Sequence, residues 1–298
     1  MSRIPERKLC LTRSMVGLIA MSVVALVVSA CSGTPNNSIT PDLSGRVNLD
    51  YESSLIIFPV DAYRISARDR SRILLAREVI MTTCMRRFGF NDDPNAAYPE
   101  PENRNFGVWN VDRVRQYGFR LVGEETQSGQ VHDEAGPWGE ARYKCLSSEK
   151  SKLDEITPPD DLMNGGAAAA IALKSLSMAS EIDAWNDAKD DWDDCISAAG
   201  LTPGKDLTNA KWSSQQSFEL QGRMDQRNPS KSDAAEGIRL ATIEAECNQK
   251  VRLTQTLGDI QASYQLPLIK QDEAVLTELK KKSQKYVDAA EKLLKEMQ

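Results

Sequence analysis

The sequence predicts a mainly helical fold built from two helical units, which are related by a weak internal repeat. Each unit is expected to be held by one disulfide, and the first unit to contain long irregular loops. Three observations predict this fold. Apolar residues recur at helical spacing through most of the second half. A Cys-x4-Gly motif begins at Cys84 and again at Cys195. Four cysteines remain beyond residue 31, and an even number in an exported chain suggests two disulfides.

Residues 1–30 are predicted to be a signal peptide that is removed. A basic start is followed by an apolar run from Met15 to Ala30, which is shorter than the about 20 residues that a membrane-spanning helix needs. The run ends in Val28-Ser29-Ala30-Cys31, a pattern typical of lipoprotein cleavage sites. We therefore expect Cys31 to carry diacylglycerol and palmitate, and to anchor the protein on the extracytoplasmic face of the cell membrane. The alternative is an ordinary secretory signal with a chance cysteine.

Charge narrows the classes of partner. The precursor has a net charge of −6, and the mature chain has −9 because the removed segment holds four basic residues and one acidic residue. An acidic protein is repelled by an anionic membrane, so the lipid must supply the membrane contact. The same charge disfavours nucleic acid as a partner. Residues 31–45 are rich in Ser, Gly, Pro and Asn and are predicted to form a flexible tether.

The chemistry of the basic residues divides the rest of the chain. Residues 46–150 contain thirteen Arg and two Lys, whereas residues 151–298 contain four Arg and fourteen Lys. Pro158 and Pro159 lie near the point of change and are typical of a linker. We therefore expect a first helical and loop unit over 46–155 and a second helical bundle over 162–298.

The repeated motif predicts two helix ends and favours one disulfide pairing. In both copies an apolar residue follows the glycine, as expected where glycine stops a helix and the chain folds back on the last turn. Four cysteines allow three pairings, and the repeat favours Cys84–Cys145 with Cys195–Cys247. Each bridge would stabilise the fold by about 4 kcal/mol in the chain-entropy model. Buried reduced thiols are the alternative, and no closely spaced cysteine pair indicates a metal site.

The second unit is predicted to contain three long helices. Helical spacing indicates a helix over about 167–199 and another over about 233–264, with Pro267 kinking or breaking the chain. Apolar residues between Leu276 and Met297 then follow alternating steps of three and four, which is coiled-coil spacing. We expect this last helix to pack antiparallel on the protein's own bundle, with partner binding or dimerisation as the alternative.

The first unit is less regular. Ser66 with Asp69 predicts the start of its helix, and Leu55 to Val60 is consistent with a short strand or an extended strap. Long loops are expected over 91–110 and 122–137. Three aromatic residues of these loops are candidates for ligand contact, with packing onto the helices as the alternative reading: Tyr98, Trp109 and Trp138.

No catalytic constellation is identified, and no metal or cofactor is predicted. His132 is the single histidine and has no nucleophile motif beside it. An acidic helix face is interpreted as solvated rather than as a cation site, because it lacks the glycine turn of a calcium loop. It consists of Asp183, Asp187, Asp190, Asp191 and Asp194.

Several segments resemble uncharacterised cell-envelope lipoproteins of actinobacteria. The similar segments are Phe58 to Tyr63, Cys84 to Phe90, Gln116 to Phe119, and Ala241 to Ile269. The resemblance spans most of the mature chain and implies a Gram-positive envelope. It implies no activity and no catalytic residues.

The sequence favours a membrane-anchored, non-catalytic binding or accessory protein. Its partner would be an envelope protein, a peptide or a cell-wall fragment. One alternative is a cell-wall hydrolase that uses a carboxylate pair. Another is an immunity lipoprotein that sequesters an antimicrobial peptide, since an acidic surface suits a cationic peptide.

Overall fold

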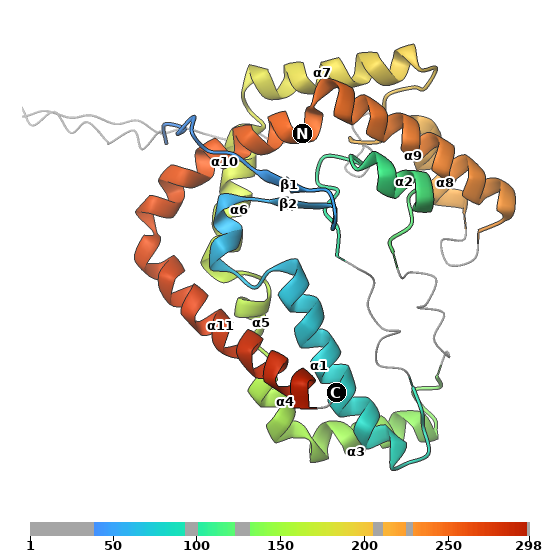
Figure 1. Cartoon of the computed structure of the whole chain (residues 1–298), viewed down its shortest axis with the longest axis vertical. Helices are drawn as coiled ribbons and strands as arrows, with labels where there is room; N and C mark the ends of the chain where they lie inside the picture. The colour runs from blue at the N-terminus through green and yellow to red at the C-terminus, as the bar shows by residue number, and fades with distance from the viewer. Residues whose placement is uncertain (1–38, 93–100, 123–131, 205–210, 225–228, 297–298) are drawn as a thin grey trace, which may run out of the picture. The chain divides into compact units, whose positions relative to one another are not determined.

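The structure is a computed structural model that describes residues 39–92, 101–122, 132–204, 211–224 and 229–296 (Figure 1). Helices dominate these ranges, as predicted, and the only regular strands in them form one antiparallel pair. The elements are β1 (Asn48–Asp50), β2 (Leu55–Ile57), η1 (Pro59–Tyr63), α1 (Ala67–Arg86), α2 (Val111–Tyr117), α3 (Pro137–Ser148), α4 (Lys150–Ile156), α5 (Asp160–Met163), α6 (Gly166–Ala179), α7 (Asp183–Ala198), α8 (Gln215–Arg223), α9 (Lys231–Val251), α10 (Leu253–Gln271) and α11 (Glu273–Glu296).

The segment expected to be a short strand or strap contains both a strand and a 3₁₀ turn. β2 pairs with β1 in a register that places Leu49 opposite Ile56. Pro59 then ends the strand and opens η1, where its missing N–H costs nothing. The Asp61 carboxylate accepts a hydrogen bond from the Phe58 N–H at 2.8 Å and so holds this turn in place.

Both predicted helix ends are confirmed. Gly89 and Gly200 have φ angles of 89° and 81°, in the left-handed region that glycine enters most readily. After the first, the Phe90 N–H donates to the Met85 carbonyl at 3.2 Å. The equivalent bond after the second helix joins Leu201 to Ile196 at 2.9 Å. The two copies therefore share the same hydrogen-bonded ending.

The predicted disulfide pairing is also confirmed. Cys84 of α1 is bonded to Cys145 of α3, and Cys195 of α7 is bonded to Cys247 of α9. Each bridge closes a loop of more than fifty residues, with separations of 61 and 52. In each case the bridge starts in the last turns of the helix that ends in the repeated glycine.

Two helices predicted to be continuous are each divided into two. The helix expected over 167–199 ends at Ala179 and restarts at Asp183, because Ser180 to Ile182 turn the chain so that α6 packs on α10 while α7 packs mainly on α9. The helix expected over 233–264 is broken at Arg252, whose φ of 56° is left-handed. The Asn248 side chain then accepts a hydrogen bond from the Thr254 N–H at 3.0 Å and helps to start α10.

Pro267 does not break its helix, so of the kink or break that the sequence predicted, the break is absent. α10 continues through it to Gln271. A proline cannot donate to the carbonyl four residues earlier, which here belongs to Ser263. That carbonyl instead accepts a hydrogen bond from the Asp42 N–H at 2.8 Å. The segment after residue 39 therefore replaces the bond that the proline removes.

This contact also shortens the predicted tether. Gly45 is buried against α10, and a Cβ at this position would lie 2.7 Å from backbone atoms of Ala262 and Ser263. Only glycine permits so close an approach. Val47 is buried in the main hydrophobic cluster. The predicted tether of 31–45 is therefore too long, because its last residues belong to the folded body, whereas residues 31–38 lie outside the described ranges.

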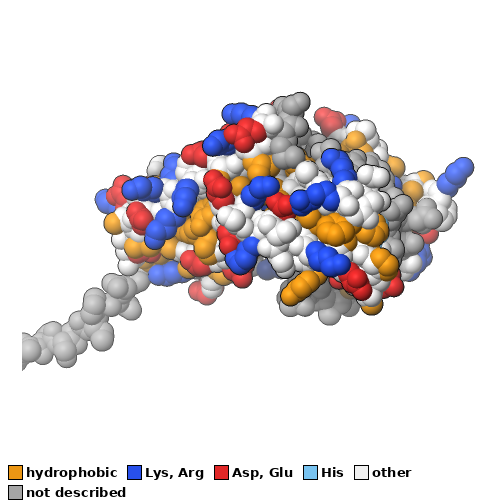
Figure 2. Space-filling view, turned by 90° about the horizontal axis from the view of Figure 1, so that it is seen from below, with side chains coloured by type: hydrophobic (Ala, Val, Ile, Leu, Met, Phe, Trp, Pro, Cys, Tyr) orange, Lys and Arg blue, Asp and Glu red, His pale blue; other side chains and the backbone are white. Residues whose placement is uncertain are grey.

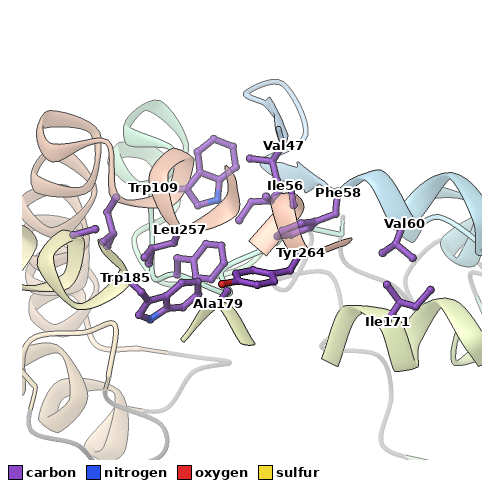
Figure 3. Packing of buried hydrophobic residues seen from close by; sticks show 14 of the residues in the cluster. Val47, Ile56, Phe58, Val60, Trp109, Ile171, Ala179, Trp185, Leu257 and Tyr264 are labelled. Carbon is purple, nitrogen blue, oxygen red and sulfur yellow. The ribbon is translucent and has the colours of Figure 1, made fainter. Parts of the chain in front are cut away.

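The cores cross the boundary predicted near residue 158. Phe58 and Val60 share the larger hydrophobic cluster with Leu257 and Tyr264 of α10 (Figure 3). A second cluster joins Ile73 of α1 to residues of α11. The structure groups the chain from Ile39 onward as one compact unit. The predicted boundary therefore marks a change in composition and a connection between helices, while the packing continues across it.

The last helix packs within the protein. Leu276, Leu279 and Ala290 of α11 are buried, and the helix contacts α1 and α4. In the described ranges no helix is both long and apolar enough to cross a membrane. On the face shown in Figure 2, basic and acidic side chains alternate with small apolar areas, so that face carries no extended region of a single charge.

Candidate functional site

The structure does not bring the predicted aromatic residues together. The Trp109 indole is buried, donates to the Asn103 carbonyl at 2.7 Å, and packs edge-on against Tyr51. Trp138 lies at the start of α3, stacked on His132 with ring centroids 4.5 Å apart. Tyr98 falls outside the described residues. Trp109 and Trp138 therefore both have structural partners and belong to different clusters.

The Asp92 carboxylate joins the two loop ends near α3. Its two oxygens lie 3.0 Å from His132 Nε2 and 3.0 Å from Trp138 Nε1. Asp92 lies in the first predicted loop, over 91–110, and His132 lies in the second, over 122–137. His132 therefore connects the two loops through Asp92 and Trp138. Neither of these partners is a nucleophile of the kind that a histidine base activates.

A cavity of about 500 Å³ lies where η1, α6, α7 and α10 meet two loops of the chain. We call it the Trp185 pocket. Its volume is in the range typical of small-molecule sites. Residues far apart in the sequence line it: Phe58, Val60, Asp61, Arg64, Asn105, Phe106, Ala172, Leu173, Leu176, Ser180, Trp185, Lys211, Trp212, Gln261 and Gln265.

Four aromatic rings form one side of the pocket. Phe106 lies at the centre of the group, with its ring centroid 5.5 Å from that of Trp185 and 6.0 Å from that of Trp212. Phe58 is 6.5 Å away on another side. All these contacts are edge-to-face, which is a favourable geometry for aromatic pairs. Leu173, 70% exposed, adds an apolar side chain at the rim.

The backbone of the loop before α2 allows this aromatic group to form. Gly107 has a φ of 80°, and a Cβ there would lie 2.6 Å from the Trp212 carbonyl oxygen. A glycine is therefore required where the two loops cross. The Asn248 side chain fixes the neighbouring Phe106 by donating to its carbonyl at 3.0 Å.

Two buried hydrogen-bond donors in the lining have no partner among the described residues. They are the Trp185 indole N–H and the Gln265 side-chain amide. Trp185 is 2% exposed and Gln265 is fully buried. The orientation of the Gln265 amide follows from its neighbour, because the Val60 N–H requires an acceptor and lies 3.1 Å from Oε1. Nε2 is therefore the atom of the Gln265 amide that has no partner.

The neighbouring Gln261, by contrast, has a hydrogen-bonded side-chain amide. Gln261 lies one turn earlier on α10 and also lines the pocket. Its Nε2 donates to the Ala172 carbonyl at 3.1 Å and lies 3.4 Å from the Ser175 hydroxyl. Buried polar groups are nearly always hydrogen-bonded, and an unsatisfied one costs about 1–3 kcal/mol. Trp185 Nε1 and Gln265 Nε2 are therefore two buried donors of the lining residues that the described structure leaves unsatisfied.

Charged side chains stand at one edge of the pocket. The Arg64 guanidinium bonds to the Asp61 carboxylate, with Nε 2.8 Å from Oδ1. Lys211 lies over the Trp212 ring, with Nζ 5.3 Å from the ring centroid. Within the described ranges Lys211 forms no ion pair. The local balance is therefore positive on a protein whose net charge is negative.

A buried carboxylate supports the pocket from behind. Glu244 of α9 accepts a hydrogen bond from the Ser214 N–H at 2.7 Å and so holds the loop that carries Trp212. Burial raises the pKa of Glu244, and hydrogen bonds from Ser217 and Ser214 oppose that shift. Trp192 lies seven residues after Trp185 on α7 and donates its indole N–H to the backbone carbonyl of Glu244 at 3.3 Å.

The acidic face of α7 does not enter the pocket. Its five aspartates are exposed: Asp183, Asp187, Asp190, Asp191 and Asp194. Asp193 is different, because burial raises its pKa while Lys189 holds it in an ion pair at 2.5 Å. Across the described residues no group of three or more metal-ligating side chains is positioned to hold an ion.

A second cavity of about 770 Å³ shares Phe58, Asp61 and Arg64 with the Trp185 pocket. It lies along β2 and the start of α1. Among the described residues no buried, unpartnered side-chain atom faces it. The smaller cavity is therefore the stronger candidate for a specific site.

Sequence reasoning predicted the helix over 167–199 that carries Trp185 and did not identify the pocket. Trp185 and Trp192 lie on the same face of their helix, and this spacing does not show whether either residue contacts a ligand or only the core. The difference lies in their partners, which come from other parts of the chain. Comparison with protein-family models, curated proteins and solved structures found no match. Function is therefore inferred from the geometry of the site.

Proposed function

We propose that this protein is a lipid-anchored, extracytoplasmic binding protein that takes a small ligand into the Trp185 pocket without transforming it. The observation that carries the proposal is an aromatic cavity of about 500 Å³ whose lining includes Trp185 and Gln265, two residues with buried donors that have no partner in the described structure. A ligand would gain these two hydrogen bonds only where the side chains that cover the donors moved aside, and each bond would then remove a desolvation penalty of about 1–3 kcal/mol.

Binding without turnover agrees with the chemistry of the lining. Its titratable side chains are Asp61, Arg64 and Lys211, and the first two are bonded to each other. A general base must lie within hydrogen-bond reach of the proton that it removes. The Asp61 oxygens accept hydrogen bonds from Arg64 and from the Phe58 N–H, which fix this carboxylate in its turn. The pocket therefore supplies recognition groups rather than a reacting group.

Anchoring rests on the sequence before the folded body. Lipidation of Cys31 would tether the protein, and the two disulfides are typical of chains that fold in an oxidising compartment. The tether that follows would let the pocket meet a ligand or an envelope partner at the membrane surface. Delivery of the bound ligand to such a partner, as an accessory protein does, is part of the proposal.

Native mass spectrometry tests the binding role. The protein would be isolated from the cell envelope and released gently, and the mass of any retained small molecule would be recorded. We expect a retained species that is reduced in Trp185→Phe and kept in Trp192→Phe. Equal retention by both variants, or no retained species at all, would contradict the proposal.

Cell fractionation tests the anchor separately. The wild type is expected in the membrane fraction, and Cys31→Ala is expected to lose the lipid and leave that fraction. A Cys31→Ala protein of unchanged mass that stays in the membrane fraction would show that another feature holds it there.

A further inference from the structure

The turn from Asp42 to Gly45, which we call the Leu43 turn, displays a leucine at its tip. The Gly45 N–H donates to the Asp42 carbonyl at 3.0 Å and closes the turn. The Asp42 carboxylate also accepts from the Ser44 N–H at 2.9 Å and from the Ser44 hydroxyl at 2.7 Å. Asp at the first position and Gly at the last are typical of such turns, whereas a leucine side chain contributes nothing that the turn needs.

Leu43 is the most exposed large apolar side chain of the described structure, with 76% of its surface accessible to water. Tyr143 of α3 follows with 74%. Single exposed apolar residues are common on protein surfaces, so exposure alone assigns no role to Leu43. The way in which the turn is held, and its place in the chain, distinguish Leu43 from the other exposed residues.

The Leu43 turn is fastened to α10 and to the chain that follows it. The Asp42 N–H donates to the Ser263 carbonyl at 2.8 Å, and Gly45 is buried against the α10 backbone. The Arg46 guanidinium donates to the carbonyls of Leu43, at 2.6 Å, and of Gly45, at 2.7 Å. Leu43 therefore has a defined place on the folded body, next to the point where the tether joins it.

The chain between the proposed lipid anchor and this turn is short. Seven residues separate Cys31 from Ile39, the first described residue. The eight Cα-to-Cα steps, each of at most about 3.5 Å, span no more than about 28 Å. A folded body of this size is wider than that span, because its radius of gyration alone is about 18 Å. Lipid on Cys31 would therefore keep the region around Ile39 and Leu43 close to the membrane surface.

Charge does not oppose membrane contact at this place. The mature chain is acidic, but the charged side chains that the structure connects with the turn are balanced. Arg46 lies 3.6 Å from Asp259. The pKa of Asp42 is lowered by hydrogen bonds from Ser44 and by the charge of Lys270. Two basic and two acidic side chains therefore offset each other, so an anionic membrane repels this region less than the protein as a whole.

From these features we infer that the Leu43 turn is the membrane-facing tip of the folded body, and that Leu43 inserts into the headgroup region of the lipid bilayer. An apolar side chain at the boundary of headgroups and acyl chains leaves water, as the apolar faces of interfacial helices do. Burial of one leucine would favour the docked orientation by about tenfold. The inference goes beyond ligand binding and rests on the proposed anchor at Cys31.

Fluorescence quenching in vesicles tests this inference. The lipoprotein, isolated with its lipid, would be reconstituted into phosphatidylcholine vesicles that contain a lipid with a spin label near its headgroup. A thiol-reactive nitrobenzoxadiazole dye would be attached to Ser44→Cys, beside Leu43, or to Tyr143→Cys on α3. The four cysteines of the folded body are disulfide-bonded, so the dye reacts at the new thiol. We expect the dye at position 44 to be quenched several-fold more strongly than the dye at position 143.

A second substitution separates insertion of the leucine from mere closeness to the anchor. Leu43→Ser, added to the protein labelled at position 44, should remove most of the quenching difference, because it lowers the preference for the docked orientation by about tenfold. Leu146→Ser, at an exposed leucine of α3, is the matched control and should leave the difference unchanged. Thermal unfolding midpoints equal to that of the labelled parent would show that both variants are folded.

The outcomes distinguish membrane docking from the anchor. Equal quenching at positions 44 and 143, or quenching at position 44 that Leu43→Ser leaves unchanged, would overturn the inference. Flotation of the wild-type protein with the vesicles shows whether the anchor is present. If the protein floats and the dye at position 44 is not quenched, docking fails and the anchor stands. If the protein does not float, both proposals fail.

Discussion

Replacing each of two tryptophans on α7 by phenylalanine should have different effects on stability, although the residues look alike in sequence. Trp185 and Trp192 are 2% and 1% exposed and lie seven residues apart on one helix. The Trp192 indole N–H donates to the Glu244 carbonyl, whereas the Trp185 indole N–H has no partner in the described structure. The two substitutions remove the same atoms, so their difference isolates the hydrogen bond.

The magnitude follows from the partners. Trp192→Phe loses one net hydrogen bond, worth about 1 kcal/mol, together with ring contacts. Trp185→Phe loses similar ring contacts but no hydrogen bond, and it also removes a buried donor that is unsatisfied in the free protein. We therefore expect Trp192→Phe to lower the free energy of unfolding by at least about 1 kcal/mol more than Trp185→Phe.

Guanidinium unfolding followed by far-ultraviolet circular dichroism would measure this difference, because the signal does not depend on the replaced indole. The disulfides must stay oxidised, and the m-values of both variants should match the wild type so that midpoints can be compared. If Trp185→Phe proves as destabilising as Trp192→Phe, Trp185 has a partner in solution. The ligand-binding interpretation of its N–H would then be refuted.

Three further predictions follow from the fold. Gly45→Ala should cost about 1–3 kcal/mol of stability because its Cβ would meet the α10 backbone. The control Gly222→Ala, which has open space around it, should be neutral or stabilising, and equal effects of the two changes in thermal unfolding would contradict the close contact at Gly45. Burial raises the pKa of Glu244 above its ordinary value of 4.5, so the folded protein loses stability as pH rises from about that value. Glu244→Gln should flatten this pH dependence of the free energy of unfolding, and an unchanged slope would contradict the raised pKa. Replacing Cys195 and Cys247 together by alanine should lower the free energy of unfolding by about 4 kcal/mol, and a loss below about 1 kcal/mol would show that the bridge contributes little.

Local patterns in the sequence were sufficient for several elements of the fold. The repeated Cys-x4-Gly motif predicted two helix ends, and the glycines at 89 and 200 adopt the required left-handed conformation. It also favoured the disulfide pairing that the structure contains. These predictions succeed because a helix end is decided by neighbouring residues. The repeat then relates the remaining cysteines by position.

Patterns that extend over more than one helix were less informative. Apolar spacing continues smoothly through Ser180 and Arg252, yet the chain turns at both places. Periodicity records which face of a helix is buried, and two short helices with aligned faces give the same record as one long helix. The partners that separate them, such as Asn248 capping α10, come from tertiary contacts.

By itself, the sequence determined the helical class, the disulfide framework and the prediction of a lipid anchor at Cys31. Tertiary structure alone decided that Pro267 stays within a helix, since Asp42 must arrive from the other end of the chain to bond the freed carbonyl. It alone also assembled the Trp185 pocket from six separate segments. The physical reason is that a hydrogen-bond donor becomes a binding group only when its surroundings exclude water and offer no partner. Those surroundings are set by residues distant in sequence.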